Sequence, residues 1–190
     1  MNILIAGVGG QGTLLASRIL GHVAVKQGYD VKVSEVHGMA QRGGSVVTYV
    51  KFGEKVYSPI IEDGEADIIL AFEELEACRY LPALKKGGKL LCSRQCIDPM
   101  PVITGAMQYP GAIPEKLKAA GVDIIMVEAY RLAKEAGSEK VVNVVLIGAL
   151  AALMHLDKEI WLTSIRETVP PKFLEINCKA FTLGYESVAK

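Results

Sequence analysis

A glycine-rich turn near the start of the chain contains the first residues whose types and spacing could do chemistry. The turn comprises Gly7, Gly9, Gly10, Gln11 and Gly12. Its glycines match the dinucleotide-binding pattern GxGxxG, and they let the backbone bring peptide N–H groups at a helix N-terminus close to a phosphate. The turn therefore predicts an anion site. A second interpretation stays open, in which the glycines only permit a tight turn and close packing of a helix on a strand.

A polar loop supplies the second set of candidates. It follows a predicted strand and contains Glu35, His37, Gln41, Arg42, Gly43 and Gly44. In nicotinamide-binding folds an acid at the end of the second strand holds the ribose hydroxyls, and Glu35 has about that position. The guanidinium of Arg42, beside a backbone without side chains, suits a phosphate or a carboxylate. The alternatives are a surface arginine in a turn for Arg42 and a loop histidine held by a backbone hydrogen bond for His37.

Motifs for self-sufficient catalysis are missing from the sequence. It has no GxSxG turn, no GxxxxGK[ST] phosphate loop and no HExxH zinc helix. Its cysteines lack the repeated close spacing that holds zinc or an iron–sulfur cluster, and they are Cys78, Cys92, Cys96 and Cys178. We expect all four to be free thiols buried as small apolar groups, and no metal site. These candidates describe a component of an enzyme better than a complete one.

The candidate residues must be positioned by the elements around them. The apolar run at 3–6 has no polar alternation, which is typical of a central strand covered on both faces. Apolar residues at helical spacing predict a helix over 13–27. The runs 45–52 and 55–61 flank a turn and are expected to pair as an antiparallel hairpin. Further strands are predicted at 31–36, 67–72, 89–93, 102–104 and 122–127.

Together these elements predict an α/β fold. We expect a three-layer α/β/α arrangement around a Rossmann-like mixed sheet with an antiparallel hairpin. Helical patterns occupy 111–120 and nearly all of the chain from Ala129 onward. A single domain over 1–190 is expected, with an α/β core over 1–127 and a mainly helical C-terminal segment over 128–190.

Composition restricts the class of protein. Lys and Arg total 21 and Asp and Glu total 21, so the basic footprint of a nucleic-acid partner is not visible. No apolar run approaches the roughly 20 residues that cross a bilayer, so no membrane partner is expected. No secretion leader is recognisable, which predicts a cytoplasmic protein. Hydrophobic residues make up 51% of the chain, and we expect the excess apolar surface to meet a partner protein.

Two long motifs resemble those of a known family. They are the runs ILIAGVGGQG at 3–12 and SEVHGMAQRGGS at 34–45. The pair resembles the gamma-type domain of the 2-oxoacid:ferredoxin oxidoreductases, and the second run resembles the indolepyruvate branch in particular. The resemblance covers the α/β part of the chain, and no specific motif is recognised in the helical tail.

The resemblance implies a subunit of an enzyme that oxidatively decarboxylates an aryl pyruvate, in particular indolepyruvate, with coenzyme A. The products are an acyl-CoA, CO2 and reduced ferredoxin. The resemblance also implies that thiamine diphosphate, Mg and [4Fe-4S] clusters belong to a larger alpha subunit, and that this chain alone binds no cofactor. Coenzyme A is the implied co-substrate near the glycine turn and near Arg42, Gly43 and Gly44. The implied candidates at the partner's active site are Glu35, His37, Gln41 and Arg42.

Two other functions remain open on the residues alone. The first is a free-standing NAD(P)-binding oxidoreductase that uses the glycine pattern and Glu35. The second is a purely structural subunit whose glycine turn binds no ligand.

Overall fold

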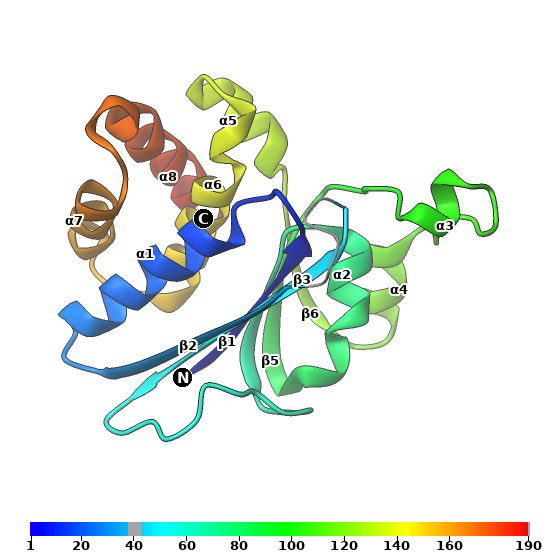
Figure 1. Cartoon of the computed structure of the whole chain (residues 1–190), viewed down its shortest axis with the longest axis horizontal. Coiled ribbons are helices and arrows are strands. Elements are labelled where there is room, and N and C mark those ends of the chain that lie inside the picture. The colour runs from blue at the N-terminus through cyan, green and yellow to red at the C-terminus, as the bar shows by residue number, and fades with distance from the viewer. Residues whose placement is uncertain (38–42, 190) are drawn as a thin grey trace.

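The computed structural model describes residues 1–37 and 43–189 and shows one mixed sheet between two layers of helices (Figure 1). The strand order is β2-β3-β1-β4-β5-β6. Strand β3 runs antiparallel to both of its neighbours, β1 and β2, whereas β1, β4, β5 and β6 pair in parallel. The predicted mixed α/β sheet is therefore confirmed. The strands are β1 (Asn2–Val8), β2 (Asp30–His37), β3 (Ser45–Gly53), β4 (Ala66–Ala71), β5 (Leu84–Ser93) and β6 (Asp123–Val127).

The helices divide unequally between the two faces of the sheet (Figure 1). One face is covered by α1 (Thr13–Lys26), α5 (Ala129–Ala136), α6 (Val142–Met154), α7 (Lys158–Thr168) and α8 (Leu174–Val188). The other face is covered by α2 (Glu74–Arg79) and α4 (Ile113–Ala119), whereas α3 (Met100–Ile103) projects away from the sheet. Short 3-10 turns are η1 (Leu81–Ala83), η2 (Glu139–Val141) and η3 (Pro171–Phe173).

Strand β1 lies at the centre because both of its faces are apolar. Ile3 and Ile5 contribute to the core beneath α1 and α5–α8, whereas Leu4 and Ala6 contribute to the core beneath α2 and α4. All four side chains are buried. The predicted central strand with two covered faces is confirmed, and it leads directly into the glycine turn and α1.

The predicted hairpin between 45–52 and 55–61 is wrong. Residues 55–61 form a loop, in which Val56 donates its backbone N–H to Asp30 Oδ2 at 2.9 Å. Pro59 lies within this run, and proline lacks the N–H that a ladder requires. The antiparallel partners of β3 are instead β2, which precedes it, and β1.

The strand predicted at 102–104 is also wrong, because Met100–Ile103 forms helix α3. An apolar run of this length fits either structure, and here proline decides between them. Pro99 accepts the backbone N–H of Val102 at 2.8 Å, and Pro101 occupies the first turn, where its missing N–H is tolerated. We call residues 97–109 the arm, because Figure 1 shows this segment extending from the body of the protein.

The expectation that all four cysteines are buried is only partly correct. All four are free thiols, and Cys92 is buried. Cys78 and Cys178 are partly exposed, and Cys96 is exposed where β5 leads into the arm. Cys96 lies after the end of β5, and therefore outside the part of the sheet on which α2 and α4 pack.

Helices α6 and α8 approach each other through two glycines. An ideal Cβ on Gly184 would lie 1.9 Å from the carbonyl oxygen of Val145, and one on Gly148 would lie 2.1 Å from that of Phe181. Backbone atoms cannot move aside as a flexible side chain can. This contact allows α6 to be buried along nearly its whole length. No helix in the described part of the chain is long and apolar enough to span a membrane.

Replacing Gly184 should therefore destabilise the fold. We expect Gly184→Ala to lower the free energy of unfolding by about 3 kcal/mol or more, because overpacking here forces two backbones apart. Chemical denaturation followed by circular dichroism measures this change. Gly111→Ala is the control, since Gly111 has nothing within 4 Å of its Cβ position, and it should change stability by less than about 0.5 kcal/mol. Equal stability of the two variants would contradict the close helix contact.

Candidate functional site

The glycine turn lies where the direction of the fold changes. Neighbouring strands β1 and β4 are parallel, but α1 follows β1 on one face of the sheet and α2 follows β4 on the other. In open α/β sheets such a switch leaves a crevice beyond the carboxyl ends of the strands, and ligands bind there. The turn at Gly9–Gly12 begins at the end of β1, so it lies at this crevice.

The glycines of the turn do not share one role. Gly12 is the N-cap of α1 at φ 79°, and a Cβ there would lie 2.6 Å from Asn143 Nδ2, whose amide donates to the carbonyl of Gly12 at 3.2 Å. A Cβ on Gly7 would lie 3.0 Å from Gln11 Oε1. Gly10 has φ 99° and open space at its Cβ position. Gly7 and Gly12 therefore serve packing, whereas Gly10 faces space that a ligand can enter.

The side chain of Gln11 ties three strand ends together. Its Oε1 accepts the backbone N–H of Val8, the last residue of β1, at 2.7 Å. Its Nε2 donates to the carbonyl of Phe72, just after β4, at 3.1 Å and to Gln95 Oε1, just after β5, at 3.2 Å. These partners fix which end of the Gln11 amide carries the nitrogen, because the oxygen faces a donor and the nitrogen faces two acceptors.

A cavity of about 260 Å³ opens beside this amide. It lies between the glycine turn, the end of β5 and the helical segment around η2, and it is lined by Gly10, Gln11, Gln95, Tyr130, Glu139, Lys140 and Val142. Because Gln95 Oε1 accepts from Gln11, its Nε2 is left as a donor, and no described residue accepts from it. The cavity wall thus holds an amide donor that a ligand can use.

Charge at the mouth of the cavity is not balanced. Lys134 Nζ lies 3.2 Å from Glu139 Oε1 and 4.5 Å from the centre of the Tyr130 ring. Hydrogen bonds from Tyr130 and then Lys134 lower the pKa of Glu139, so this carboxylate is ionised and paired. Lys140 has no ion-pair partner among residues 1–37 and 43–189. The cavity therefore presents a cation and an amide donor, a combination that suits an anion or a carbonyl oxygen.

The second sequence motif adjoins the first through the pairing of β1 with β3. Gly9 donates its backbone N–H to the carbonyl of Gly44 at 2.9 Å, and Val8 pairs with Ser45. Gly43 has φ 78° and is exposed. The candidates Gln41 and Arg42 lie outside the described residues, as does the side chain of His37. The glycine parts of the two predicted motifs are thus side by side.

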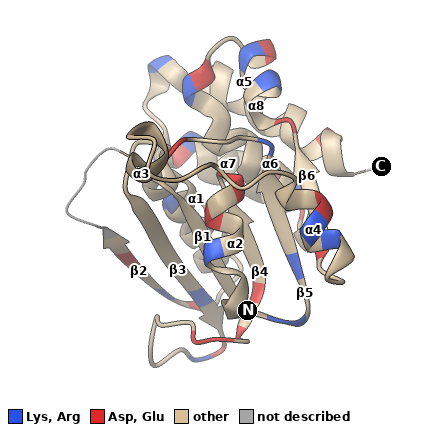
Figure 2. Cartoon of the chain, turned by 90° about the vertical axis from the view of Figure 1, so that its right-hand side faces the viewer, with Lys and Arg blue, Asp and Glu red and all other residues tan. Residues whose placement is uncertain are grey.

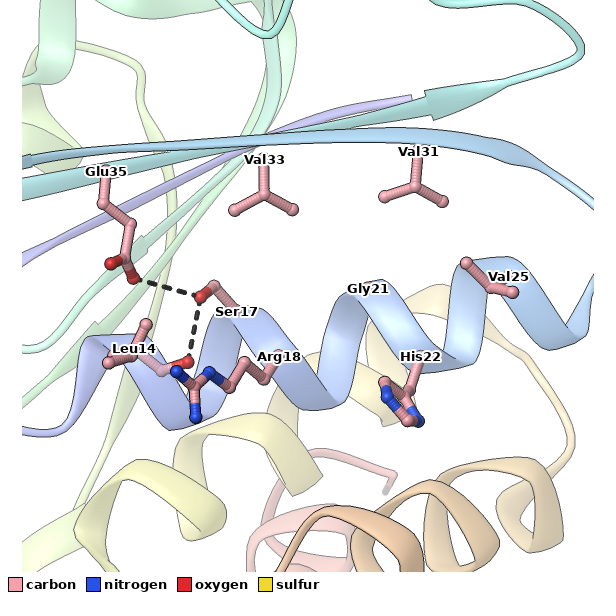
Figure 3. Close-up of a pocket in the computed structure, with 9 residues that line it drawn as sticks. All are labelled: Leu14, Ser17, Arg18, Gly21, His22, Val25, Val31, Val33 and Glu35. Carbon is pink, nitrogen blue, oxygen red and sulfur yellow. Dashed lines mark hydrogen bonds between the residues drawn. The ribbon is translucent and has the colours of Figure 1, made fainter.

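Glu35 lies elsewhere, in a groove of about 460 Å³ between α1 and β2 (Figure 3). Its Oε1 accepts from Ser17 Oγ at 3.3 Å, and Ser17 also donates to the carbonyl of Leu14. The nicotinamide position predicted for Glu35 is wrong in this fold. Strand β3 is inserted between β1 and β2, so the end of β2 is not beside the glycine turn as a ribose-binding acid requires.

Buried acids gather at the start of α2, close to the cavity. Glu73 is 0% exposed, and its Oε2 accepts the backbone N–H of Glu76 at 2.9 Å as the N-cap of α2. Its Oε1 also accepts the N–H of Ile97 at 3.1 Å and the hydroxyl of Tyr109. Burial raises the pKa of Glu74. Among the described residues, no group of three or more His, Cys, Asp or Glu side chains could hold a metal ion.

Several residues of the cavity and of the adjoining glycine turn's contacts were not candidates on sequence grounds. Gln95 could have been found, because polar residues just after parallel strands tend to meet at one edge of the sheet. Asn143 falls within an apolar helix, and nothing in its sequence neighbours points to the glycine turn. Tyr130 and Lys140 come from α5 and η2, and only the packing of these elements brings them to the cavity.

The chain is similar to known proteins along nearly its whole length. The family described as "Pyruvate ferredoxin/flavodoxin oxidoreductase" matches residues 2–187. "Indolepyruvate oxidoreductase subunit IorB" of Thermococcus kodakarensis is 45% identical over 192 residues, which cover 98% of this chain and 95% of that protein.

Solved structures of similar fold agree with this match. A keto/oxoacid ferredoxin oxidoreductase gamma subunit from Geobacter sulfurreducens has a TM-score of 0.73 at 28% identity, over 98% of this chain and 97% of that one. A 2-oxoglutarate:ferredoxin oxidoreductase from Magnetococcus marinus, with 2-oxoglutarate, coenzyme A and succinyl-CoA bound, has a TM-score of 0.77 at 21% identity. That match covers 100% of this chain but 31% of the other.

Removing the Gln11 amide should loosen the edge of the sheet at the cavity. We expect Gln11→Leu to lower the free energy of unfolding by about 2 kcal/mol, because the N–H of Val8 and the carbonyl of Phe72 lose their partner. Gln27→Leu, at an exposed glutamine just after α1, is the matched control and should change stability by less than about 0.5 kcal/mol. Urea denaturation measures both, and an equal loss would show that the amide does not hold the strand ends.

Proposed function

The chain belongs to the pyruvate ferredoxin/flavodoxin oxidoreductase family and is a subunit of a 2-oxoacid:ferredoxin oxidoreductase, and from this premise we propose its substrate and its role in the complex. The enzyme acts on an aryl pyruvate, with indolepyruvate as the leading substrate. The identity of 45% to an indolepyruvate oxidoreductase subunit over 98% of the chain supports this choice. The 2-oxoacid loses CO2, its acyl group is transferred to coenzyme A, and the electrons released reduce ferredoxin.

The role of this chain is to receive coenzyme A at the cavity beside the glycine turn. The observation that carries this proposal concerns Gln95 Nε2 and Lys140 Nζ, an amide donor and a cation on two residues that line the same cavity. Neither atom has a hydrogen-bond or ion-pair partner among the described residues. Coenzyme A offers both amide carbonyls and phosphates, which match these two groups. The related Magnetococcus marinus enzyme was solved with coenzyme A bound, and its fold over this region is the same.

The backbone of the turn adds to this recognition. Gly10 has open space at its Cβ position, and α1 begins at Thr13, where the N-cap Gly12 has no side chain to bind the first N–H groups. The helix dipole favours negative charge at this end. The adjoining Gly43 and Gly44, with Arg42, extend the same anion-binding edge in this proposal. Glu35, His37, Gln41 and Arg42 remain our candidates for residues that face the active site of the partner.

The reactive cofactors belong to a larger subunit in this proposal. The described residues offer no set of ligands for an iron–sulfur cluster or a magnesium ion, so no chemical step is assigned to such a group on this chain. Thiamine diphosphate on the larger subunit would supply the decarboxylation, and [4Fe-4S] clusters there would pass electrons to ferredoxin. A purely structural subunit is the second candidate, since the packing contacts of Gly7 and Gly12 account for two of the glycines without any ligand.

Reconstitution tests the assignment of function. Neither this chain nor the larger subunit alone should reduce ferredoxin, whereas the two together should do so only when indolepyruvate and coenzyme A are both present. Reduction of ferredoxin or benzyl viologen is followed by absorbance. Full activity of the larger subunit without this chain would contradict the proposal. Activity with another 2-oxoacid but not with indolepyruvate would contradict only the choice of substrate.

Lys140 tests the coenzyme A site. We expect Lys140→Ala to raise the KM for coenzyme A about tenfold with little change in kcat, because one charge-assisted contact to the bound co-substrate is lost. The control is Lys118→Ala, at an exposed lysine of α4 on the opposite face of the sheet. Steady-state kinetics of the assembled enzyme measures both. An unchanged KM for coenzyme A in Lys140→Ala would favour the purely structural subunit.

A further inference from the structure

The arm exposes three large apolar side chains that the described part of the chain leaves largely uncovered. Met100 and Ile103 on α3 are each 65% exposed, and Met107 beyond it is 64% exposed. No Lys, Arg, Asp or Glu occurs between Pro99 and Pro114. Figure 2 accordingly shows α3 without any charged residue, whereas α2 and α4, on the same side of the sheet, both carry charged residues. Exposing an apolar segment to water is unfavourable, and exposed apolar patches of this kind often mark a site of interaction.

The arm is nevertheless ordered by its own hydrogen bonds. Met107 donates its backbone N–H to the carbonyl of Pro101 at 3.0 Å, which closes the segment into a loop. Thr104 and Gly105 donate to the carbonyls of Met100 and Val102. A segment that is already ordered loses little conformational entropy when it binds.

A single buried carboxylate anchors both ends of the arm. Glu73 Oε1 accepts the backbone N–H of Ile97 at the start of the arm and the hydroxyl of Tyr109 at its end. The Tyr109 oxygen in turn accepts the N–H of Leu75 at 3.2 Å. Burial, and next the hydrogen bond to Glu73, raises the pKa of Tyr109, so its hydroxyl stays protonated and keeps donating. The arm is therefore held in one direction relative to the sheet.

We propose that the arm, residues 97–109, is the element by which this chain docks into an apolar recess of the larger subunit, with Met100, Ile103 and Met107 as the inserted side chains. This inference rests on the proposed function for the identity of the partner. It goes beyond that function by naming the docking surface.

The size of the apolar patch argues against a second copy of this chain as the occupant. Three such side chains give a patch on the order of a few hundred Å², a size that often marks an interaction site on a monomer. A stable complex buries about 800 Å² on each partner. Two arms packed on each other would fall well short of this area. The arm therefore needs a partner that also covers neighbouring surface.

The neighbouring surface is the cavity, which points to the larger subunit. Gln95 lines the cavity and lies two residues before the arm begins at Ile97. A partner seated on the arm would thus reach the mouth of the cavity. In the Magnetococcus marinus enzyme the same fold occupies 31% of a longer chain, so there the remaining polypeptide is attached to this domain. The present chain instead covers 95% of the Thermococcus kodakarensis subunit, so in the proposed complex the larger subunit recognises the domain by its surface.

The test compares two triple variants of the full chain for binding to the purified larger subunit. Met100→Ser, Ile103→Ser and Met107→Ser together should raise the Kd at least about 30-fold, because they remove the inserted anchors. The matched control combines Val25→Ser, Tyr57→Ser and Ile60→Ser, three exposed apolar residues away from the arm. The control should bind within about twofold of the wild type. An unchanged Kd in the arm variant, or an equal loss in the control, would overturn the proposal.

A second variant tests the anchor without touching the inserted residues. Tyr109→Phe removes the hydroxyl that binds Glu73, and we expect amide hydrogen exchange over residues 97–109 to become about tenfold faster, with weaker binding. Tyr57→Phe, at a tyrosine that is 88% exposed, should change neither quantity. In the wild-type complex, exchange over the arm should slow. Absence of this protection would overturn the docking even if the triple variant misfolded.

Two outcomes separate this inference from the proposed function. If the wild-type chain does not bind the larger subunit at all, the proposed function fails and the arm with it. If the wild type binds and the complex is active but the arm variant binds equally well, only the docking assignment fails. A wild-type dimer in sedimentation that the arm variant breaks, with unchanged binding of the larger subunit, would assign the arm to a second copy instead.

Discussion

The amide of Gln11 is the contact on which the geometry of the cavity depends. Three hydrogen bonds join it to the N–H of Val8, the carbonyl of Phe72 and Gln95, so the ends of β1, β4 and β5 are held at fixed separations. This contact also explains Gly7, because any Cβ there would lie 3.0 Å from the Gln11 oxygen. The glycine pattern thus has a structural part, which makes room for the amide, and an open part at Gly10, which faces the cavity.

Local patterns predicted the elements well, because β1, the glycine turn and α1 are set by adjacent residues. The order of the strands was not predictable in this way. An alternating run such as 31–36 shows that a strand forms but not which strand lies beside it, and the insertion of β3 moved Glu35 away from the turn. Sequence motifs identified cavity-lining residues where these lie within one motif, as at Gly10. It was missed at Gln95 and Lys140, which are brought together only by tertiary packing.

Glu73 illustrates how a correct local interpretation can be incomplete. Glu73 directly precedes α2 and caps this helix, because its Oε2 accepts the backbone N–H of Glu76. The other carboxylate oxygen binds Ile97 and Tyr109, which are 24 and 36 residues away in sequence. A fully buried carboxylate is stable only when its acceptor sites are filled by donors. The cap is therefore one part of a larger contact, whose other part fixes the direction of the arm.

The position of the arm gives the cavity a property that it lacks in the isolated chain. Lys140 is exposed, and in contact with bulk water a cation and an amide distinguish poorly between one anion and another, since water competes for both. In the proposed docking the larger subunit covers both the arm and the cavity, because the cavity residue Gln95 lies two residues before the arm. Exclusion of water then lowers the local dielectric constant and strengthens every polar contact in the cavity. The proposed docking of the arm and the proposed co-substrate site are in this way coupled: under both proposals the site becomes selective only when the larger subunit, with its reactive groups, is in place.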